Sequence, residues 1–524
     1  MLDRFSSELL LRLALAGGFL TLAACTTLGP DYEEPDVAWL ESWQPSAYGA
    51  RLDAPAEEQN DLQFWWVLFN DPALNRLIAV ARQENLQLRI AGLRIFESRA
   101  LLGIAGSQLY PQSQQVGGSI NYVNNQFHGG DAPASGQSFG NYNLGFNIGW
   151  EIDFWGRFQR GIESAGATFF ASIANQQDVQ VLISAQVTDV YYAYRITENR
   201  IAIARKNAEI QKRSFEITQT LFKNGQQSEL DLQQAKTQYL ATLSGIPDLE
   251  ITLLKTRNSL AALLGRPPGD IPELDVPEYK LPVISTDSIQ DIPANLLNRR
   301  PDIRAAAWQI ATQSAQIGIA EADYYPAISL LGSIGLTGNS LSGSSDSSGL
   351  IVGPALRWNI FDHGSIENNI RVQDARLQQL IESYQDSVLQ AAREVDDAAY
   401  SIQKTAEQQV LIDKAVEASE RALEIANTRY REGYEGFQRV LDAQRAMFLQ
   451  ADRQLLIEGN HISSFIGLYK GLGGGWTETP FEQLVPGDVT KTMQDRTDWG
   501  DLLTTPISET EDNSVPAQET SQHE

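Results

Sequence analysis

The sequence has one cysteine, few basic residues and no long hydrophobic run after its N-terminus, and each scarcity excludes a class of protein. A single cysteine among 524 residues rules out an intramolecular disulfide and argues against a cysteine-based zinc site. No later segment approaches the roughly 18 to 20 consecutive apolar residues of a membrane helix, so a helical membrane protein is excluded. The chain carries 40 basic and 66 acidic residues, giving a formal charge of −26. Because phosphate binding requires clustered Lys and Arg, we expect no nucleic-acid partner.

Motifs of catalysis are also missing. No nucleotide-binding loop of the GxxxxGK[ST] kind occurs, so any energy for the protein's activity must come from a partner. The four histidines have no partner motif: His128, His363, His461 and His523. We therefore expect no catalytic residue, no cofactor and no metal site.

The first 24 residues are typical of an export signal. Residues 9 to 24 form an apolar segment that is too short to span a membrane stably and that ends in small residues. Cys25 follows a Leu-Ala-Ala sequence, which resembles a bacterial lipoprotein signal in which the cysteine becomes the acylated first residue. The alternative, a buried core cysteine, is disfavoured at the foot of such a segment. Thr26 stands where an Asp would signal inner-membrane retention, so we expect a lipidated segment, 25–70, that starts at the outer membrane.

The rest of the chain contains two copies of one pattern. Three landmarks repeat: Gly103–Pro111 with Gly318–Pro326, Trp150-x5-Gly156 with Trp358-x5-Gly364, and Phe222–Gly225 with Tyr430–Gly433. The offset is 215 residues for the first pair and 208 for the other two. We infer two structural repeats, 71–264 and 301–478, joined by a proline-rich linker, 265–300.

Each repeat is expected to contain a hairpin of two helices. Proline is absent from 134 to 246 and from 355 to 479, and a long helix interior cannot accept it. Spacings of four and three mark a heptad seam in the second window: Leu377, Ile381, Tyr384, Val388, Ala391, Val395, Ala398 and Ile402. The pattern predicts long helices at about 157–223 and 365–432, turns at Gly225 and Gly433, and return helices at about 229–264 and 437–470. Each long helix would span about 100 Å.

Between the landmarks the hydrophobic period changes to two, which is typical of strands with one apolar face. We expect strands at about 114–124, 140–155, 327–337 and 349–361. Aromatic residues at their ends suit a membrane interface: Trp150, Phe154, Trp155, Trp358 and Phe361. A soluble sandwich is the alternative for such strands. Four strands cannot close a barrel, and an open edge in lipid leaves backbone groups unsatisfied, so several chains must share one barrel if the strands span the membrane. Three chains would give twelve strands and six helical hairpins, so the strand and helix counts agree.

Six short motifs resemble the outer membrane factor family of TolC-like channels, and more closely its NodT-type lipoprotein branch, which serves resistance-nodulation-division efflux pumps. They are Gly29–Tyr32, Trp65–Trp66 with Phe69–Pro72, Ile152–Arg157, Asn298–Arg304, Trp358–Asp362 and Val440–Arg445. The resemblance implies an α+β fold: a homotrimeric 12-stranded transmembrane β-barrel in the outer membrane, with four strands per chain, continuous with a long α-helical coiled-coil tunnel in the periplasm. It implies a passive exit duct for drugs or other small molecules. The implied partners are two further copies of the chain, outer membrane lipid, a periplasmic adaptor and an inner-membrane pump.

The resemblance also implies a periplasmic gate at the tip of the tunnel. Asp442 corresponds to an aspartate that forms a constriction ring, Tyr430 to a tyrosine that holds the closed state, and Asp231 to the partner of that tyrosine. The match departs six residues after Gly433, where some family members have an acidic residue and this chain has Arg439. Arg439 is expected to pair with Asp442 or Asp231. The alternative is that both aspartates only stabilise the start of the return helices.

Two other functions remain open. A type I protein secretion system uses an exit duct of the same architecture, and a trimeric coiled-coil surface lipoprotein would serve adhesion or scaffolding. The lipoprotein would need neither pair of strands. Residues 479–524, which hold Glu509, Glu511 and Asp512 among Ser, Thr and Pro, are expected to be an acidic disordered tail.

Overall fold

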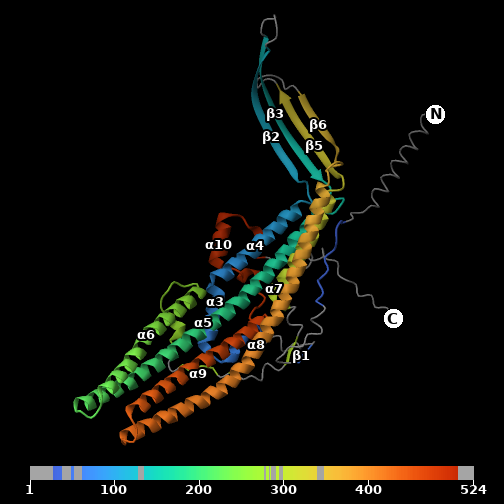
Figure 1. Ribbon diagram of the computed structural model, residues 1–524. Coiled ribbons are helices and arrows are strands. Elements are labelled where there is room, and N and C mark those ends of the chain that lie inside the picture. Colours follow the sequence, from blue (N-terminus) through green and yellow to red (C-terminus); the bar gives the residue numbers. More distant parts are fainter. Residues whose placement is uncertain are drawn as a thin grey trace, which may run out of the picture.

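The computed structural model describes most of the chain. The described residues are 27–37, 49–51, 62–127, 135–275, 279–282, 284, 291–293, 299–338 and 347–504. The expected export signal and Cys25 lie outside them. Figure 1 shows a curved sheet at one end of the molecule and a body of long helices that extends away from it. The fold class is α+β, as the sequence predicts.

Three helices in each half of the chain have a counterpart of equal length in the other half. The α-helices of the described residues are α3 Pro72–Glu84, α4 Leu86–Ser107, α5 Arg157–Lys223, α6 Glu229–Leu263, α7 Pro301–Ala322, α8 Ser365–Arg431, α9 Phe437–Gly471 and α10 Gly487–Arg496. α4 and α7 have 22 residues each, α5 and α8 have 67, and α6 and α9 have 35. The duplication inferred from the landmarks therefore extends to the helices. No helix in the described ranges is long and apolar enough to cross a membrane.

The sheet joins the two repeats through their inner strands. Its strands are β2 Ser113–Phe127, β3 Ser135–Glu151, β5 Ala327–Gly338 and β6 Ser347–Arg357. They are antiparallel in the order β2-β3-β5-β6, with Phe146 opposite Ile334 in the contact between the repeats. A short parallel pair, β1 Gly49–Arg51 with β4 Asp291–Pro293, links the N-terminal region to the linker.

Two of the predicted strands are too long at their C-terminal ends. β3 ends at Glu151 rather than 155, and β6 ends at Arg357 rather than 361. The chain leaves the sheet early because aspartates after each strand begin a helix: Asp153 Oδ2 accepts the Gln159 amide at 2.8 Å, and Asp362 Oδ2 accepts the Ile366 amide at 2.7 Å. The first strand pair is longer at its other end, where pairing reaches Phe127 and Ser135.

The two faces of the sheet differ in polarity. Paired residues share a face, and one face carries Val116, Ile120, Phe146, Ile334, Leu350 and Val352. The opposite face carries mainly small and polar residues, Ser119, Asn121, Asn143, Asn147, Ser333 and Gly353, with Leu331 and Ile351 as apolar exceptions. Side chains on the apolar face are largely exposed: Val116 by 75 %, Ile120 by 71 % and Val352 by 75 %. The alternation predicted from the sequence is therefore confirmed, and no part of the described chain covers the apolar face.

The predicted heptad seam forms the core of the helical body. Tyr384, Val388, Ala391, Val395 and Ile402 are all buried, and Leu377, Ile381 and Ala398 pack against them. Trp65 stacks on Tyr469 of α9 at 5.4 Å between ring centroids, so the Trp-Trp motif before α3 belongs to the same core.

The prediction of a disordered tail from residue 479 is wrong for residues up to 504. This segment contains α10 and packs beside α4 (Figure 1). Its Leu484, Val485, Met493 and Leu503 are buried against Ile95, Phe96 and Phe169. A few apolar anchors hold the segment in place although its overall composition is acidic and polar. Residues 505–524 lie outside the described chain.

A charged cavity lies between the two repeats. It has a volume of about 150 Å³. Its charged lining residues come from four helices: Asp178 from α5, Arg300 and Asp302 from the start of α7, Glu394 from α8 and Lys470 from α9. Arg300 is buried and donates from Nη1 to the Gly471 carbonyl at 2.6 Å and to Glu394 at 3.1 Å. Burial, with a contribution from the Asp302 carboxylate, raises the pKa of Asp178 to about 6, against the opposing charges of Arg300 and Lys470.

We predict that Asp178→Asn stabilises the protein at neutral pH. The folded-state pKa lies above the usual carboxyl value, so the ionised form opposes folding, and this penalty grows as pH rises from about 4 to about 6 and persists above. At pH 7.5 the free energy of unfolding of the variant should therefore be larger by roughly 1 to 3 kcal/mol, and its melting temperature higher. At pH 4 the two proteins should melt at nearly the same temperature. Circular dichroism melts across this range measure it. Asp386→Asn, the exposed equivalent in the second repeat, is the control and should change neither melt.

Candidate functional site

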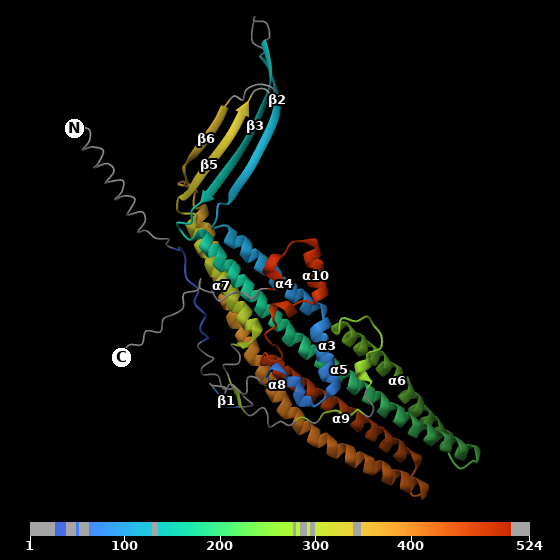
Figure 2. The same ribbon diagram turned by 180° about the vertical axis from the view of Figure 1, so that it is seen from behind.

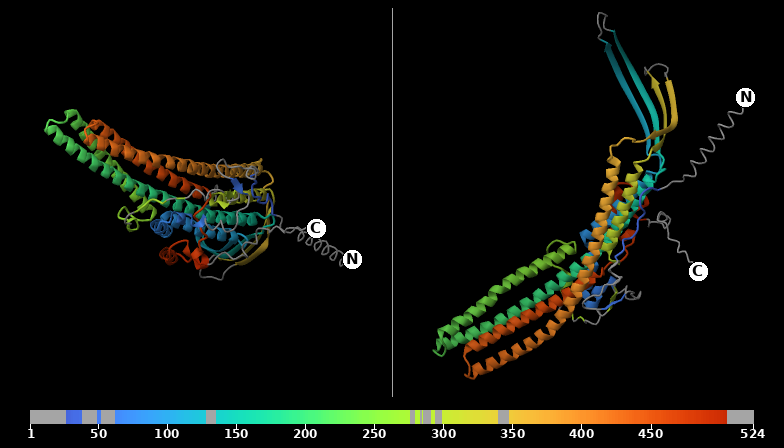
Figure 3. Two further views of the ribbon diagram at one scale, coloured as in Figure 1. Left: turned by 90° about the horizontal axis from the view of Figure 1, so that it is seen from below. Right: turned by 45° about the vertical axis from the view of Figure 1, so that its right-hand side comes forward.

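The two helical hairpins end side by side at the tip farthest from the sheet (Figures 1 and 3). Each turns at a glycine with positive φ, Gly225 at 74° and Gly433 at 80°. The turns close with equivalent bonds: the Gln226 amide donates to the Leu221 carbonyl and the Tyr434 amide to the Arg429 carbonyl, both at 2.9 Å. These bonds define the left-handed helix stop that the sequence predicts.

Tyr430 lies in an apolar cluster that joins the tips. Its ring packs against Phe437 at 5.3 Å between centroids, and the cluster also contains Ala235, Val440 and Leu441. The Tyr430 hydroxyl is buried and has no hydrogen-bond partner among the described residues. Burial and then the negative charge of Asp231 raise the pKa of Tyr430. Asp231 is therefore close enough to act on Tyr430 electrostatically, but the two side chains are not bonded.

The Asp231 carboxylate is instead part of a helix cap. The Ser228 hydroxyl donates to Asp231 Oδ2 at 2.5 Å, and the Asp231 amide donates back to Ser228 Oγ at 3.2 Å. Ser228 is thus the N-cap of α6, and the Asp231 carboxylate accepts the hydroxyl proton of the capping residue. This arrangement supports the alternative in which Asp231 stabilises the return helix.

Asp442 and Arg439 lie on the exposed side of α9. Gln438 Nε2 donates to Asp442 Oδ1 at 3.0 Å, one turn earlier on the same helix. Within the described chain Arg439 forms no ion pair with Asp442 or Asp231, so the expected pairing is absent. The structure thus places Asp442 on a free surface and Tyr430 and Asp231 in the contact between the hairpins.

The expected interface aromatics gather where the sheet meets the helices. Trp150 Nε1 donates to the Leu109 carbonyl at 3.1 Å, and Trp358 Nε1 donates to the Tyr324 carbonyl at 2.9 Å, the same bond in each repeat. Trp155 Nε1 donates to the Pro326 carbonyl at 3.0 Å and bridges the repeats. Phe154 and Phe361 come a few residues after the ends of β3 and β6, and Phe361 is 89 % exposed.

Above the tip, the contact of α5 with its neighbours combines a small apolar cluster, Ala204, Ala208 and Ile246, with buried amides that we call the polar seam. Asn207 is 2 % exposed and Gln211 1 %, and none of their four side-chain polar atoms has a partner in the part of the chain that the structure describes. Gln444 of α9 is also buried and donates from Nε2 to Ser214 Oγ at 3.0 Å. Nearer the sheet, Arg200 holds Asp452 of α9 with two bonds of 2.7 and 3.2 Å. The Arg200–Asp452 ion pair thus lies between the apolar core of the helical body and the polar seam around Asn207 and Gln211.

The comparisons with known proteins decide the family. The model of the outer membrane efflux protein family matches residues 77–266 and 292–474. The chain belongs to this family. This efflux protein is 28 % identical to the pyoverdine export outer membrane protein OpmQ of Pseudomonas putida, over 87 % of the chain and 96 % of OpmQ. It is 27 % identical to the probable outer membrane lipoprotein SilC of Salmonella typhimurium, over 89 % and 99 %.

The solved structure of the outer-membrane channel OprN has the same fold. Its TM-score against this efflux protein is 0.73, with 32 % identity over 86 % of the chain and all of OprN. The resemblance stated from the motifs is confirmed. The gate residues and the lipidation site remain predictions.

Sequence reasoning missed the polar seam of this efflux protein, although a signal was present. From the buried Ala204 and Ala208 of α5, further steps of three and seven residues lead to Gln211 and Thr218, which are also buried. Polar residues at seam positions mark a weakened contact. The Arg200–Asp452 pair, 252 residues apart, has no such local signal.

We predict that the double variant Asn207→Leu with Gln211→Leu strengthens this contact. Buried amides without partners cost roughly 1 to 3 kcal/mol each, and leucine replaces them with apolar packing. The melting temperature of this efflux protein should rise by several degrees, as measured by circular dichroism in detergent. Glu209→Leu, on the exposed side of the same helix, is the control. A lower melting temperature in the double variant would show that the amides are satisfied and stabilising.

Proposed function

We propose that the protein is the exit duct of a tripartite efflux pump, in which it passively conducts small molecules from a periplasmic adaptor and an inner-membrane pump to the exterior. The observation that carries the proposal is the sheet. Its apolar face is exposed over all four strands, and β2 and β6 each have a partner on one side only in the described chain. An exposed apolar face is unfavourable in water, and an open strand edge is unfavourable in lipid unless another strand pairs with it.

Lipid on the apolar face and copies of the same chain at the two edges satisfy both requirements. The strands have 15, 17, 12 and 11 residues, which is enough for the roughly 9 to 11 residues of a tilted membrane strand. The polar face, rich in Asn, Ser and Gly, would then line a lumen. Three chains supply twelve strands in one barrel and six hairpins in one tunnel, so the two parts close with the same number of copies.

The helical part fits the periplasmic half of such a duct. α5 and α8, with 67 residues each, are about 100 Å long, so the tips lie far from the membrane. An adaptor would meet the duct at these tips. Acylation of Cys25 would hold the chain at the inner face of the outer membrane. Trp150 and Trp358 lie at the C-terminal ends of β3 and β6, where the chain passes to the long helices, and this end of the sheet would face the periplasm.

We infer a gate at the tip from the correspondence of Asp442 to the constriction aspartate of the family, and its exposed position supports the inference. In a trimer its carboxylate, exposed in one chain, would occur three times near the axis and would favour cations over anions. Tyr430 and the nearby Asp231 would act within one chain, at the contact between the two hairpins. Arg439, which is unpaired with either aspartate in the described chain, would lower the negative potential of the ring.

Two alternatives remain distinguishable. The exit duct of a type I protein secretion system has the same architecture, and a neighbouring gene for an ABC transporter would favour it, whereas an adaptor and a twelve-helix pump favour efflux. A surface lipoprotein with a coiled-coil stalk is disfavoured by the sheet, because a stalk has no use for an exposed apolar face.

Native mass spectrometry in detergent tests the assembly. We expect a trimer that survives heating in mild detergent, because six edge strands are paired when three chains meet. A stable monomer would contradict the barrel, the duct and the gate together. Drug accumulation in a deletion strain then tests efflux itself.

Conductance in planar bilayers tests the ring. Asp442→Ala removes three negative charges from the constriction, so the preference for cations should fall at least severalfold and the closed-state leak should increase. Asp488→Ala, in α10 on the outside of the helical body, removes the same charge elsewhere and should change neither quantity. Unchanged selectivity in Asp442→Ala would remove Asp442 from the gate.

A further inference from the structure

The polar face of the four-stranded sheet carries charge at one level only. Within the described strands of this sheet, the only acidic or basic side chains are Glu151, the last residue of β3, and Arg357, the last residue of β6. Both strands end where the sheet meets the helices (Figure 2). Glu151 is opposite Ser329 and Arg357 is opposite Ala327, so both belong to the polar face. If this face lines a lumen, a solute meets strand charges only at the base of the barrel.

The rest of the polar face has amides and hydroxyls that show no preference for either sign of charge. Asn121 and Asn143 both donate from Nδ2 to Ser119 Oγ at 3.0 Å. An amide has both a donor and an acceptor, and a hydroxyl does too, so such groups accommodate neutral solutes and ions of either sign. Any selection by charge along the strands must therefore come from Glu151 and Arg357.

Arg357 is the more exposed of these two residues. Its side chain is 76 % exposed, and its Nη2 atom lies 3.7 Å from Glu151 Oε2, which is too long for a hydrogen bond. The Glu151 side chain is 21 % exposed, and Arg157 of α5 lies 3.9 Å from its other oxygen. Exposed ion pairs of this length are weak and are screened by salt. The guanidinium of Arg357 is therefore accessible to a further anion.

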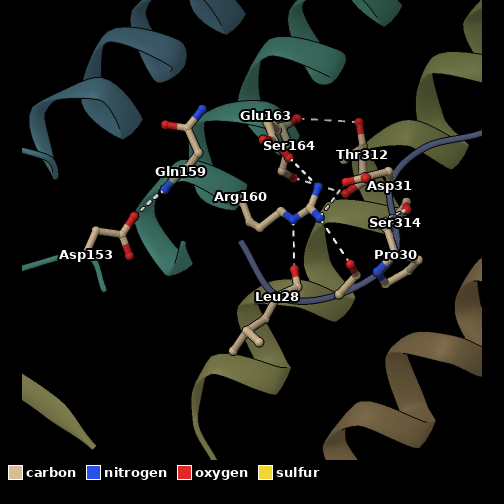
Figure 4. A network of polar contacts seen from close by, with 11 residues as sticks. Leu28, Pro30, Asp31, Asp153, Gln159, Arg160, Glu163, Ser164, Thr312 and Ser314 are labelled. Carbon is tan, nitrogen blue, oxygen red and sulfur yellow. Dashed lines mark hydrogen bonds and ion pairs between the residues drawn. The ribbon is translucent and has the colours of Figure 1, made fainter. Parts of the chain in front are cut away.

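The other carboxylates beside this junction serve the helices. Asp153 caps the start of α5 (Figure 4), and Asp362 caps the start of α8. Glu367 forms an ion pair one turn along α8. Among the described residues, only Glu151 brings a carboxylate oxygen within 4 Å of an Arg357 nitrogen. Arg357 is thus the exposed cation of the polar face.

The first repeat builds the same end of the strand without an arginine. Trp150 and Trp358 make equivalent bonds to the carbonyls of Leu109 and Tyr324, and both bonds lie within one chain. The residue before the tryptophan is Gly149 in the first repeat and Arg357 in the second. This local structure therefore needs no charge at that position, and the arginine is available for another role.

We propose that Arg357 is a specificity-determining residue of the duct, where three copies form a cationic ring at the base of the barrel that favours small anions and solutes bearing a carboxylate or phosphate. The proposal rests on the proposed function, because it requires the shared barrel and a lumen on the polar face. A ring of like charges sets the ion preference of a pore, and the guanidinium group matches the geometry of carboxylates and phosphates. The ring is opposite in sign to the Asp442 ring proposed at the tip. A solute that leaves the tunnel thus passes from a negative to a positive potential.

Reversal potentials in planar bilayers under a gradient of potassium chloride test the ring. The full-length protein carries Asp442→Ala in every sample, so that the tip does not dominate the ion preference. Arg357→Ala should reduce the ratio of chloride to potassium permeability roughly twofold or more, whereas Arg357→Lys should retain it. The difference should be clear at about 0.1 M salt and nearly vanish at about 1 M, where the screening length is only about 3 Å. A structural role of Arg357 would not give this salt dependence.

Gly149→Arg provides the converse test at the equivalent position. A Cβ on Gly149 would lie 3.6 Å from the nearest atoms beyond its chain neighbours, which is an ordinary contact, so a side chain fits there. The variant adds a second arginine per chain to the polar face and should raise the chloride preference above that of the parent. Arg496→Ala is the control, because it removes the same charge from the end of α10 and should change nothing.

The outcomes separate the ring from the duct. An unchanged permeability ratio in Arg357→Ala, or a change that is equally large at high salt, would overturn the ring while leaving the duct in place. If Arg357→Ala does not assemble, Gly149→Arg decides, and an unchanged ratio in that variant would overturn the ring. A parent protein that forms trimers but conducts no ions would contradict the proposed duct and the ring together.

Discussion

The unpaired edges of β2 and β6 are the constraint on which the rest of the molecule depends. A strand edge exposes a row of N–H and C=O groups, and neither lipid nor an apolar contact can satisfy them. Duplication gives the chain two strand pairs, which are joined through β3 and β5. In the described chain one edge strand of each repeat, β2 or β6, is left without a partner on its outer side. Each edge can meet the opposite edge of another copy. The long helices inherit that symmetry, because each strand pair continues directly into a helix of 67 residues.

Duplication fixes geometry but leaves chemistry free to differ. At the start of the short helices, Asn85 donates to the Leu263 carbonyl at 2.8 Å and Arg300 donates to the Gly471 carbonyl at 2.6 Å. Both side chains close the C-terminal end of a return helix at equivalent positions. Only the second is charged, and it brings Asp302 and Glu394 into the cavity beside Asp178. A contact that is merely structural in one repeat has become a pH-sensitive cluster in the other.

Periodicity in the sequence predicted those features that repeat locally. The seam from Leu377 to Ile402 is buried because spacings of four and three place those residues on one helix face, and the strand alternation survives because each strand has two distinct environments. Features that depend on distant residues were not accessible. α10 was missed because a handful of anchors such as Leu484 and Met493 outweigh a polar composition only when Phe96 and Phe169 lie opposite them. The ends of β3 and β6 were misplaced because helix caps, not hydrophobicity, decide where the chain leaves the sheet.

The distribution of polar groups along α5 has a mechanical consequence. In the middle of the helix, burial of Ile183, Val187 and Tyr191 joins α5 to the common core, and this contact is costly to separate because apolar area would meet water. Between the Arg200–Asp452 pair and the tip, the buried surface of α5 is mixed. Asn207 and Gln211 bury amides without partners in the described chain, and Ala204 and Ala208 beside them belong to a small apolar cluster that Phe448 of α9 also contacts. Separating the hairpins there exposes this cluster and the one around Phe437, and both are smaller than the common core. Opening α5 toward the tip therefore loses less apolar burial than opening it at the core.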